Sequence, residues 1–417
     1  MKIVLITPNY APEQGACAER VRNLAEFLRN KGHEILVITA LPNYPKGKIF
    51  DTYRNHFHKT EIINHITVLR YWLFASHSKN LFFRLLAMLS LAITVLFAVP
   101  KIMKFKPNFV YVQSPPLFLA ISGYIIAKIC KAKFWLNLSD LWSNVLLDLG
   151  VISNSWVYKM IQKTEHFLYQ KADLVSGQSQ EIVENVKNIR EITKQLDNYE
   201  ELQVFLCRTG VDCSVFQPLQ NIKSQGNKVQ KNKIRFVYAG LLGIAQGVLE
   251  FCEQVSLPEN VELHIYGDGA ERNSIAKYIA NHAEKQLFLH HSLPQIELAR
   301  VLPTFDVALI LQRKSIFGTI PSKLYEAMAC GLLIMYVGNG EGKKLMQEFN
   351  LCKTFSRLSQ VYEGMKLFVF LIQYKQEYCD EKRKNARLAA EKNFDRHKIL
   401  EDFYSKIVIF ESATYID

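Results

Sequence analysis

The sequence predicts two consecutive α/β domains, each built on a doubly wound parallel sheet. Apolar strand patterns alternate with helix-length segments in the first part of the chain, and the same alternation restarts at residue 234. A polar stretch without apolar periodicity, residues 218–232, separates the two series and is expected to be an interdomain linker. The length of 417 residues also favours more than one domain, since domains average roughly 150 residues.

The first domain is expected at residues 1–217 and opens with a β-α-β pattern, which implies a parallel sheet. Its predicted elements are the strand 3–7, the helix 18–30, the strand 34–39, the strand 109–113, the helix 117–129 and the strand 134–138.

The second domain is expected at residues 233–394, where four apolar strands are separated by helix-length segments. The predicted strands are 234–239, 261–266, 306–312 and 333–337. Residues 395–417 are expected to begin with an amphipathic helix that could cross back to the first domain.

The positive charge of the chain is concentrated in one segment. The formal net charge is +12, and residues 46–133 contain 13 Lys and Arg against 2 Asp and Glu. Charge asymmetry of this kind favours an anionic surface as a partner. Basic residues here alternate with aliphatic ones rather than lining a polar groove, which argues against nucleic acid.

The same segment carries the longest apolar run of the sequence, Leu85–Val99, which is followed by three lysines. Its 15 uncharged residues are fewer than the roughly 20 that a membrane-spanning helix needs. One interpretation is a buried core helix. The other is a helix pair lying in the membrane interface, with the lysines at anionic headgroups.

The cysteines and histidines do not indicate a metal site or a disulfide framework. The eight cysteines are scattered, without a CxxC pair, and the histidines do not cluster with carboxylates at metal-binding spacing. We therefore expect no metal and a reducing compartment. The loop after the first strand has only Gly15 of a GxGxxG fingerprint, so nicotinamide and flavin cofactors are not expected.

The stretch 318–331, GTIPSKLYEAMACG, is typical of a helix start that binds an anion. Pro321 suits the first turn and Thr319 the cap. A helix N-terminus offers free N–H groups and a partial positive charge, to which Lys323 would add a full charge. Glu326 can accept hydrogen bonds from a vicinal diol. Diphosphate and ribose fit this pair, which predicts a nucleotide-sugar site; the alternative is an exposed Lys323–Glu326 ion pair on a helix face.

Several segments, taken in order, resemble the retaining glycosyltransferases of family 4 (group 1), which have the GT-B fold, and especially the branch that builds bacterial O-antigen, capsule and colanic acid. The first half matches in ITPNYAPEQGACAERVRNLAEFLRNKGHEILVIT, LSDLWSNVLLDLGVI, KADLVSGQSQ and TGVDCSVFQP. The second half matches in FVYAGLLGIAQGVLE, IYGDGAER and GTIPSKLYEAMACG. The resemblance implies two Rossmann-like domains facing a central cleft, with acceptor bound by the first and a nucleotide-sugar donor, a UDP-sugar, by the second.

The resemblance also implies roles for individual residues. The residues expected to bind donor are Gly15, Gly240, Gly243, Gln246, Gly267, Gly269, Gly318, Thr319, Ile320, Pro321, Ser322, Lys323 and Glu326. Loop glycines allow the backbone to approach a diphosphate, although Gly15 and the Gly267–Gly269 turn could equally serve the turns alone.

On the acceptor side, Asp140 follows a predicted strand end, where open α/β sheets place ligands. The resemblance assigns Asp140 to the acceptor hydroxyl, so that Asp140 and Lys323 are the expected catalytic residues; the alternative for Asp140 is a helix cap. Glu13 and Trp142 are the expected acceptor contacts.

The chain departs from the pattern of its relatives at three places. Ser143 and Asn144 replace a Pro-Glu pair that commonly follows the Asp-Leu-Trp triplet. Ile244 and Gln246 occupy a loop in which relatives place an arginine and a lysine, and Gly318 stands where many have a glutamate near the donor sugar. Lys323 must then neutralise most of the leaving diphosphate, with Arg313 or Lys314 as candidate helpers.

These observations predict a metal-independent, retaining glycosyltransferase that is cytoplasmic and peripheral on the inner face of the membrane. Its partners would be a nucleotide-sugar donor, a lipid-linked or glycan acceptor and an anionic membrane surface. The alternatives are a nucleotide-sugar epimerase of the same fold and a degenerate transferase that acts as a partner subunit.

Overall fold

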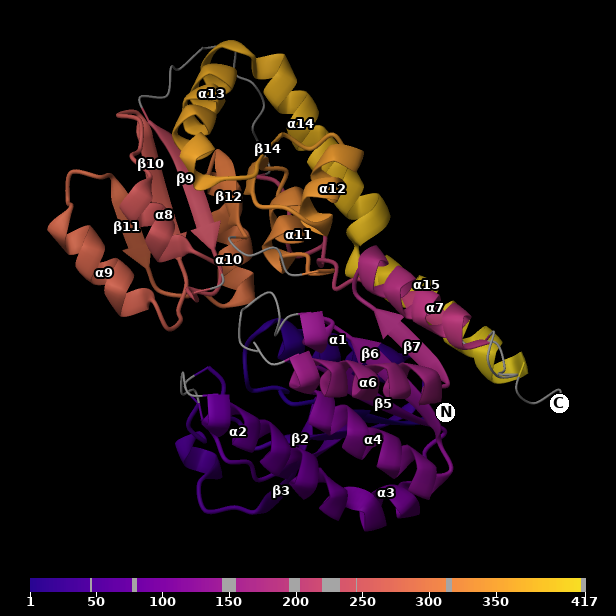
Figure 1. Ribbon diagram of the computed structural model, residues 1–417. Coiled ribbons are helices and arrows are strands. Elements are labelled where there is room, and N and C mark those ends of the chain that lie inside the picture. The colour runs from indigo at the N-terminus through magenta and orange to yellow at the C-terminus, as the bar shows by residue number, and fades with distance from the viewer. Residues whose placement is uncertain are drawn as a thin grey trace. The chain divides into compact units, whose positions relative to one another are not determined.

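The computed structural model describes residues 1–45, 47–76, 81–144, 155–194, 203–219, 233–244, 246–312 and 317–413. The chain divides into two compact units, Met1–Cys207 with Asp402–Asp417, and Arg208–Glu401 (Figure 1). Each unit is an α/β domain with a predominantly parallel sheet and helices on both faces, which confirms the predicted fold class. The predicted linker, 218–232, lies outside the described residues apart from its first two positions.

The sheet of the first unit has the strand order β3-β4-β2-β1-β5-β6-β7-β8, and only the β3–β4 pair is antiparallel. The strands are β1 (Lys2–Ile6), β2 (Glu34–Ala40), β3 (His58–Ile63), β4 (Ile66–Tyr71), β5 (Phe109–Ser114), β6 (Lys133–Leu138), β7 (Leu174–Gly177) and β8 (Gln203–Leu206). The helices are α1 (Ala16–Asn30), α2 (Leu81–Thr94), α3 (Val99–Phe105), α4 (Leu117–Cys130), α6 (Ser155–Lys171) and α7 (Gln180–Lys194), with the short 3-10 helices η1 (Asp51–Tyr53) and η2 (Val95–Ala98).

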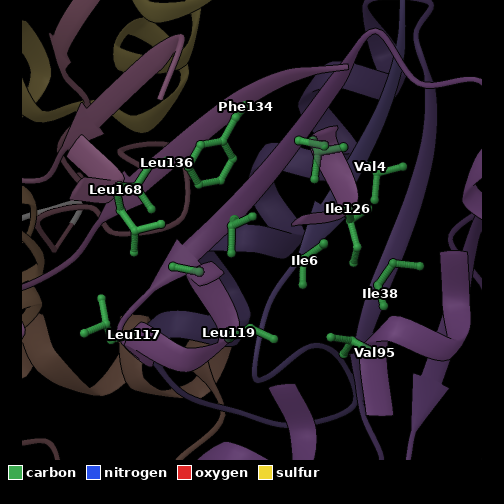
Figure 2. Packing of buried hydrophobic residues seen from close by; sticks show 14 of the residues in the cluster. Val4, Ile6, Ile38, Val95, Leu117, Leu119, Ile126, Phe134, Leu136 and Leu168 are labelled. Atoms are coloured by element: carbon green, nitrogen blue, oxygen red, sulfur yellow. The ribbon is translucent and has the colours of Figure 1, made fainter. Parts of the chain in front are cut away.

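One face of this sheet forms a large apolar core with the helices α2, α4, α6 and α7. Alternate residues of the strands point into it, as Val4 and Ile6 of β1 do, because successive side chains of a strand face opposite sides (Figure 2). Leu119 and Ile126 of α4 meet them from the helical layer (Figure 2). The central strands β1, β2, β5 and β6 are almost entirely buried, as the sequence pattern predicts.

The other face of the sheet is covered by α1 and by the end of the C-terminal helix α15 (Arg396–Ala413). The ring centroids of Trp135 on β6 and Phe403 on α15 lie 5.3 Å apart. Tyr404 packs edge-on to Phe27 of α1, and its hydroxyl lies 2.9 Å from Nε2 of His33. These contacts make the end of α15 part of the first unit, although the helix begins in the second.

The apolar segment is longer in the structure than in the sequence pattern, because α2, η2 and α3 follow one another without a break. Within the described residues, Phe82–Phe105 is long and apolar enough to cross a bilayer, by length and composition only. Only 28 % of its most apolar window is buried, so most of it is not a core helix.

The sheet of the second unit is parallel throughout and has the order β11-β10-β9-β12-β13-β14. The strands are β9 (Ile234–Ala239), β10 (Val261–Tyr266), β11 (Leu287–His290), β12 (Val307–Leu311), β13 (Leu333–Val337) and β14 (Lys353–Phe355). The helices are α8 (Val248–Gln254), α9 (Arg272–Asn281), α10 (Gln295–Val301), α11 (Ser322–Ala329), α12 (Glu341–Glu348), α13 (Val361–Tyr374) and α14 (Gln376–Ala389), with the 3-10 helices η3 (Leu302–Thr304) and η4 (Leu358–Gln360) and the π-helical turn η5 (Ala390–Phe394).

Two apolar clusters sandwich this sheet. One contains α11 and α14, and the other contains α8 and α13 (Figure 1). Residues 208–219 pack into this unit as well. The Val211 N–H donates to the carbonyl of Phe394, and Phe216 is fully buried. The boundary between the units therefore falls at Cys207–Arg208, ahead of the position suggested by the sequence.

Candidate functional site

The helix α11 starts beyond the carboxyl end of β12, where parallel sheets place their ligands. It begins at Ser322, and Pro321 holds the cap position with φ −62° and ψ 123°. The expectation that Thr319 caps the helix is wrong, because the chain is still extended at Pro321. Small residues in α11, including Ala327 and Ala329, are buried against the sheet and bring the helix close to it. The first N–H groups of such a helix have no acceptor within the helix.

The side chain of Lys323 on α11 points back toward the carboxyl end of β9. Its Nζ donates a hydrogen bond to the hydroxyl of Tyr238 at 2.7 Å and lies 4.0 Å from the centre of that ring. The Tyr238 hydroxyl in turn donates to the carbonyl of Leu241 at 2.8 Å. Burial lowers the pKa of Lys323 to about 7, and the negative charge of Glu326 opposes this shift. Lys323 is therefore a half-buried, easily titrated cation rather than one end of an exposed ion pair.

Gly240 is required beside this lysine. A Cβ at Gly240 would lie 2.8 Å from the Lys323 Nζ, and Gly240 has φ +157°. A side chain at this position would displace the ammonium from the turn, so the glycine keeps the space over the turn open.

The two glycine-rich turns of the unit interlock through their backbones. The Gly240 N–H donates to the carbonyl of Tyr266, and the Leu242 N–H donates to that of Asp268. A Cβ at Gly267 would lie 2.0 Å from the Gly240 carbonyl oxygen. Packing of turn on turn thus accounts for Gly267 independently of any ligand, and its predicted donor contact stays a prediction.

The segment before α11 is held by a buried polar bridge that the sequence analysis missed. Gln312, at the end of β12, donates from Nε2 to the carbonyl of Thr319 at 3.3 Å. The Tyr336 hydroxyl donates to Oε1 of Gln312. Gly318 has φ +72°, a left-handed conformation that favours glycine. This backbone conformation explains why a glycine, and not a glutamate, occupies position 318. Residues 313–316, including Arg313 and Lys314, lie outside the described residues.

Gln246 lies in the loop after β9, and Glu326 lies on α11. The Gln246 Oε1 is buried and has no hydrogen-bond partner in the part of the chain that the structure describes. It lies 2.8 Å from the position that a Cβ on Gly243 would take, so the side chain folds back over its own turn. Glu326 is half-buried one helical turn after Lys323. Both side chains offer oxygen acceptors, which suit ligand hydroxyl groups.

In the first unit, Asp140 is half-buried just past the end of β6, as the sequence predicts. The preceding residue, Ser139, is fixed by the guanidinium of Arg20, which donates to its Oγ at 2.5 Å, and by the Gln113 Nε2. Gln113 also accepts hydrogen bonds from Tyr111 and Asn137. A buried polar network therefore anchors one side of the Asp140 loop.

Glu165 of α6 anchors the other side of this loop. Its two oxygens accept hydrogen bonds from the backbone N–H groups of Trp142 at 2.7 Å and Ser143 at 3.2 Å. Burial raises the pKa of Glu165, while these hydrogen bonds oppose the shift. The Trp142 ring is 6 % exposed and packs edge-on to Phe118, so it serves the core more than an open surface.

Glu13 joins two loops at the carboxyl end of the same sheet. Its Oε1 accepts from the N–H groups of Asn43 and Tyr44, each at 2.8 Å, and its Oε2 accepts from the Tyr10 N–H at 3.2 Å. Glu13 is 4 % exposed, and burial raises its pKa. Gly15 packs against the Tyr44 ring, 3.1 Å from where a Cβ would lie. The predicted ligand contacts of Glu13 and Gly15 stay predictions, and their observed neighbours are these loops.

A buried arginine, also missed from the sequence, completes this arrangement. Arg70 of β4 is fully buried and donates to the carbonyls of Ala40 and Ala11, besides forming an ion pair with Glu61. It ties the end of β2 to the loop that carries Glu13. A buried charge survives only with such partners.

No group of three His, Cys, Asp or Glu side chains among the described residues is arranged to hold a metal ion. In each unit, the predicted residues with the clearest chemistry lie at the carboxyl end of the sheet. In the second unit these are Lys323, Glu326 and the Gly240 turn, and in the first unit Asp140 and its loop.

Two family models match the chain. Residues 15–192 match the model described as "Glycosyl transferase 4-like domain", and residues 220–349 match "Glycosyl transferases group 1". Among curated proteins, the chain is 24 % identical over 424 residues to WcaI of Escherichia coli (strain K12), which is named as a colanic acid biosynthesis glycosyl transferase. That alignment covers 98 % of this chain and all of WcaI.

Solved structures share the fold at lower sequence identity. Sucrose-phosphate synthase from Thermosynechococcus elongatus superposes with a TM-score of 0.70 at 14 % identity, covering 99 % of this chain and 100 % of that one. Anabaena HepE in complex with UDP and glucose has a TM-score of 0.66 at 15 % identity, covering 98 % and 99 % of the two chains.

Proposed function

We propose that the chain is a group 1 glycosyltransferase of the GT-B fold, since glycosyltransferase family models match residues 15–192 and 220–349. It transfers a sugar from a nucleotide diphosphate sugar to a lipid-linked glycan acceptor, with retention and without a metal ion. The donor is a UDP-sugar, and the product belongs to a bacterial surface polysaccharide. The name of WcaI supports the polysaccharide, and the UDP bound to HepE supports the nucleotide.

One observation carries this proposal: the Lys323 ammonium lies at the start of α11 beside the Gly240 turn. Departure of a nucleoside diphosphate builds negative charge on its oxygens, which a fixed cation and free helical N–H groups stabilise. Glu326, one turn along, would accept hydrogen bonds from the ribose hydroxyls. Gly240, Gly243, Gly267 and Gly269 lie in the adjoining turns and would let the backbone approach the diphosphate.

The proposed reaction needs no strong protein base. The C1–O bond to the diphosphate breaks, and the acceptor oxygen bonds to C1 on the face from which the diphosphate leaves. The departing phosphate oxygen takes the proton of the acceptor hydroxyl. Asp140 would orient that hydroxyl by accepting a hydrogen bond from it, and Lys323 would hold the departing diphosphate.

We further propose that the enzyme is cytoplasmic and peripheral on the inner membrane face, and that the first unit is the part that contacts the lipid. Large apolar side chains stay exposed along the α2–α3 segment, with Phe82 66 % and Phe97 62 % exposed, and Lys101 and Lys104 lie on the same segment. Such a mixture suits the headgroup boundary of an anionic bilayer. The fraction of protein that sediments with anionic vesicles should decrease as the salt concentration rises. Vesicle binding that does not depend on lipid charge would contradict the proposed membrane contact.

The function itself is tested by product analysis. Purified protein is incubated with a panel of nucleotide sugars and a lipid-linked glycan extract, and the glycolipid is examined by mass spectrometry and its anomeric configuration by NMR. The proposal expects one added sugar with the donor's configuration. An altered free nucleotide sugar would instead indicate an epimerase. Donor binding without transfer to any acceptor would indicate a degenerate partner subunit.

A further inference from the structure

The first unit contains a surface groove that the donor and acceptor sites described above do not use. Two adjoining cavities, of about 640 Å³ and about 320 Å³, share Ile49, Arg54 and Trp72 as lining residues. The first extends to His56 and Phe57, and the second extends to Lys48 and Phe74.

The groove combines cations with aromatic rings. Arg54 and Lys48 are exposed, and the lining residues that the structure describes include no carboxylate. Asp51 forms an ion pair with one nitrogen of Arg54 at 2.8 Å, but both side chains are largely exposed and such a pair is weak. Trp72 and Phe57 are 38 % and 52 % exposed. Cationic and aromatic groups together suit an anion attached to an apolar group.

The groove is continuous with the exposed apolar segment. The rings of Phe57 and Phe97 meet edge-on with centroids 5.5 Å apart, and Phe74 stacks on Phe83 of α2 at 6.0 Å. The backbone of the groove is also bonded to α2, since the carbonyl of Trp72 accepts from the Thr94 hydroxyl at 2.7 Å. An apolar surface thus leads from the cationic groove along the outside of α2 and η2.

We propose that this groove binds the phosphate or diphosphate headgroup of a long-chain polyprenyl lipid, whose hydrocarbon chain lies along the exposed residues of α2 and η2. The inference rests on the proposed function, because it names the place where the carrier of the acceptor glycan is held. Arg54 and Lys48 would bond the phosphate oxygens, and Trp72 would lie over the first carbons of the chain. The charge supplies affinity and the adjoining apolar surface supplies the selection for a lipid over a free phosphate.

The test compares Arg54→Gln with Lys104→Gln, which removes one charge from the same basic segment on α3, outside the groove. Sedimentation uses the full chain and vesicles of neutral lipid carrying the same molar charge of either phosphatidylglycerol or undecaprenyl phosphate. The wild type should bind the undecaprenyl phosphate vesicles about tenfold more tightly. Arg54→Gln and Trp72→Ala should each lose that preference, whereas Lys104→Gln should weaken both vesicle types equally.

Soluble probes separate the headgroup from the tail. Farnesyl diphosphate should bind to the wild type and compete with the vesicles, while inorganic diphosphate should do so at least tenfold more weakly. Equal binding of the two would mean a free phosphate site and would overturn the proposal. An undecaprenyl preference that survives Arg54→Gln would overturn it too.

Measurements of donor binding distinguish failure of the groove proposal from failure of the proposed function. Nucleotide-sugar binding is measured in the same variants and should not change, because Arg54 and Trp72 belong to the first unit and Lys323 to the second. If Arg54→Gln still transfers sugar with an unchanged KM for the lipid acceptor, the groove proposal is contradicted and the proposed function is not. If the wild type neither binds a donor nor transfers sugar, the proposed function itself is contradicted.

Discussion

The ammonium of Lys323 lies 4.0 Å from the centre of the Tyr238 ring and donates a hydrogen bond to the hydroxyl of the same residue at 2.7 Å. One side chain thus meets the cation both through its ring face and through its oxygen. The arrangement keeps Lys323 ordered at the start of α11, while burial keeps its pKa at about 7. Several consequences of this arrangement can be measured.

Donor binding should depend on pH through Lys323. The lysine is half-charged near pH 7 in the free protein and would be fully charged beside a diphosphate, so binding must take up a proton as the pH rises above 7. Affinity should therefore fall about fifteenfold between pH 7 and pH 8.5. Calorimetry of a nucleotide sugar in two buffers of different ionisation enthalpy measures both the affinity and the proton uptake.

Two variants control this experiment. Lys323→Met should bind weakly without pH dependence in this range, and Lys323→Arg should bind without pH dependence because arginine stays charged. An unchanged pH profile in Lys323→Met would assign the titration to another group.

Removal of the Tyr238 hydroxyl should disturb Lys323 without abolishing the fold. Tyr238→Phe deletes the acceptor for the ammonium and the donor to the Leu241 carbonyl. Because the lost bond favours the charged lysine, the pH midpoint of donor binding should move to lower pH. We expect KM for the donor to rise about fivefold, with a smaller change in kcat. A KM increase without any shift of the midpoint would indicate a merely structural role for the hydroxyl.

Glu165 should position the loop that carries Asp140. In Glu165→Ala the buried N–H groups of Trp142 and Ser143 lose their acceptor, which should lower the free energy of unfolding by about 2 kcal/mol. Urea unfolding measures this loss, and Glu184→Ala on the exposed surface of α7 is the control. We also expect kcat to fall while KM for the donor stays constant. A lowered donor affinity instead would contradict a role confined to the Asp140 loop.

Gly318 should be intolerant of a side chain because of its φ of +72°. Gly318→Ala should lower the free energy of unfolding by about 1 kcal/mol and weaken donor binding, since the segment before α11 must shift. Gly32, with φ +86° and open space around it, is the matched control. Gly32→Ala should cost similar stability and leave donor binding unchanged. Equal donor affinity in the two variants would show that the backbone at Gly318 does not affect donor binding.

The sequence predicted the elements best where local pattern and tertiary burial agree. The strands β9, β10 and β13 begin and end at the predicted residues. β9 and β13 are buried along almost their whole length, whereas β10 alternates between buried and half-buried residues, and both patterns are typical of strands. The start of α11 was misplaced, since an extended Pro321 is compatible with the same residues as a helical one. The helix Leu81–Thr94 continues into α3 through a 3-10 turn, which apolar composition alone does not reveal.

The charged residues of the candidate site were predicted from the sequence, whereas the residues that hold them in position were not. Lys323 and Glu326 lie close together in sequence, so their spacing on one helix could be read directly. Tyr238 lies 85 positions before Lys323 and reads as an ordinary aromatic strand residue. Glu165 acts on Trp142 from a helix 23 positions later. Such supports depend on tertiary contacts, which the sequence pattern does not contain.

The central claim is that Lys323 neutralises the departing diphosphate, and the most direct test is sugar transfer by Lys323→Ala with the donor titrated. The control is Lys277→Ala, which removes an exposed lysine from α9 of the same unit. Loss of a charged contact of about 2 kcal/mol predicts a fall in kcat/KM of roughly thirtyfold for Lys323→Ala, with Lys277→Ala unchanged. Transfer by Lys323→Ala within about twofold of wild type, at every donor concentration, would contradict the account.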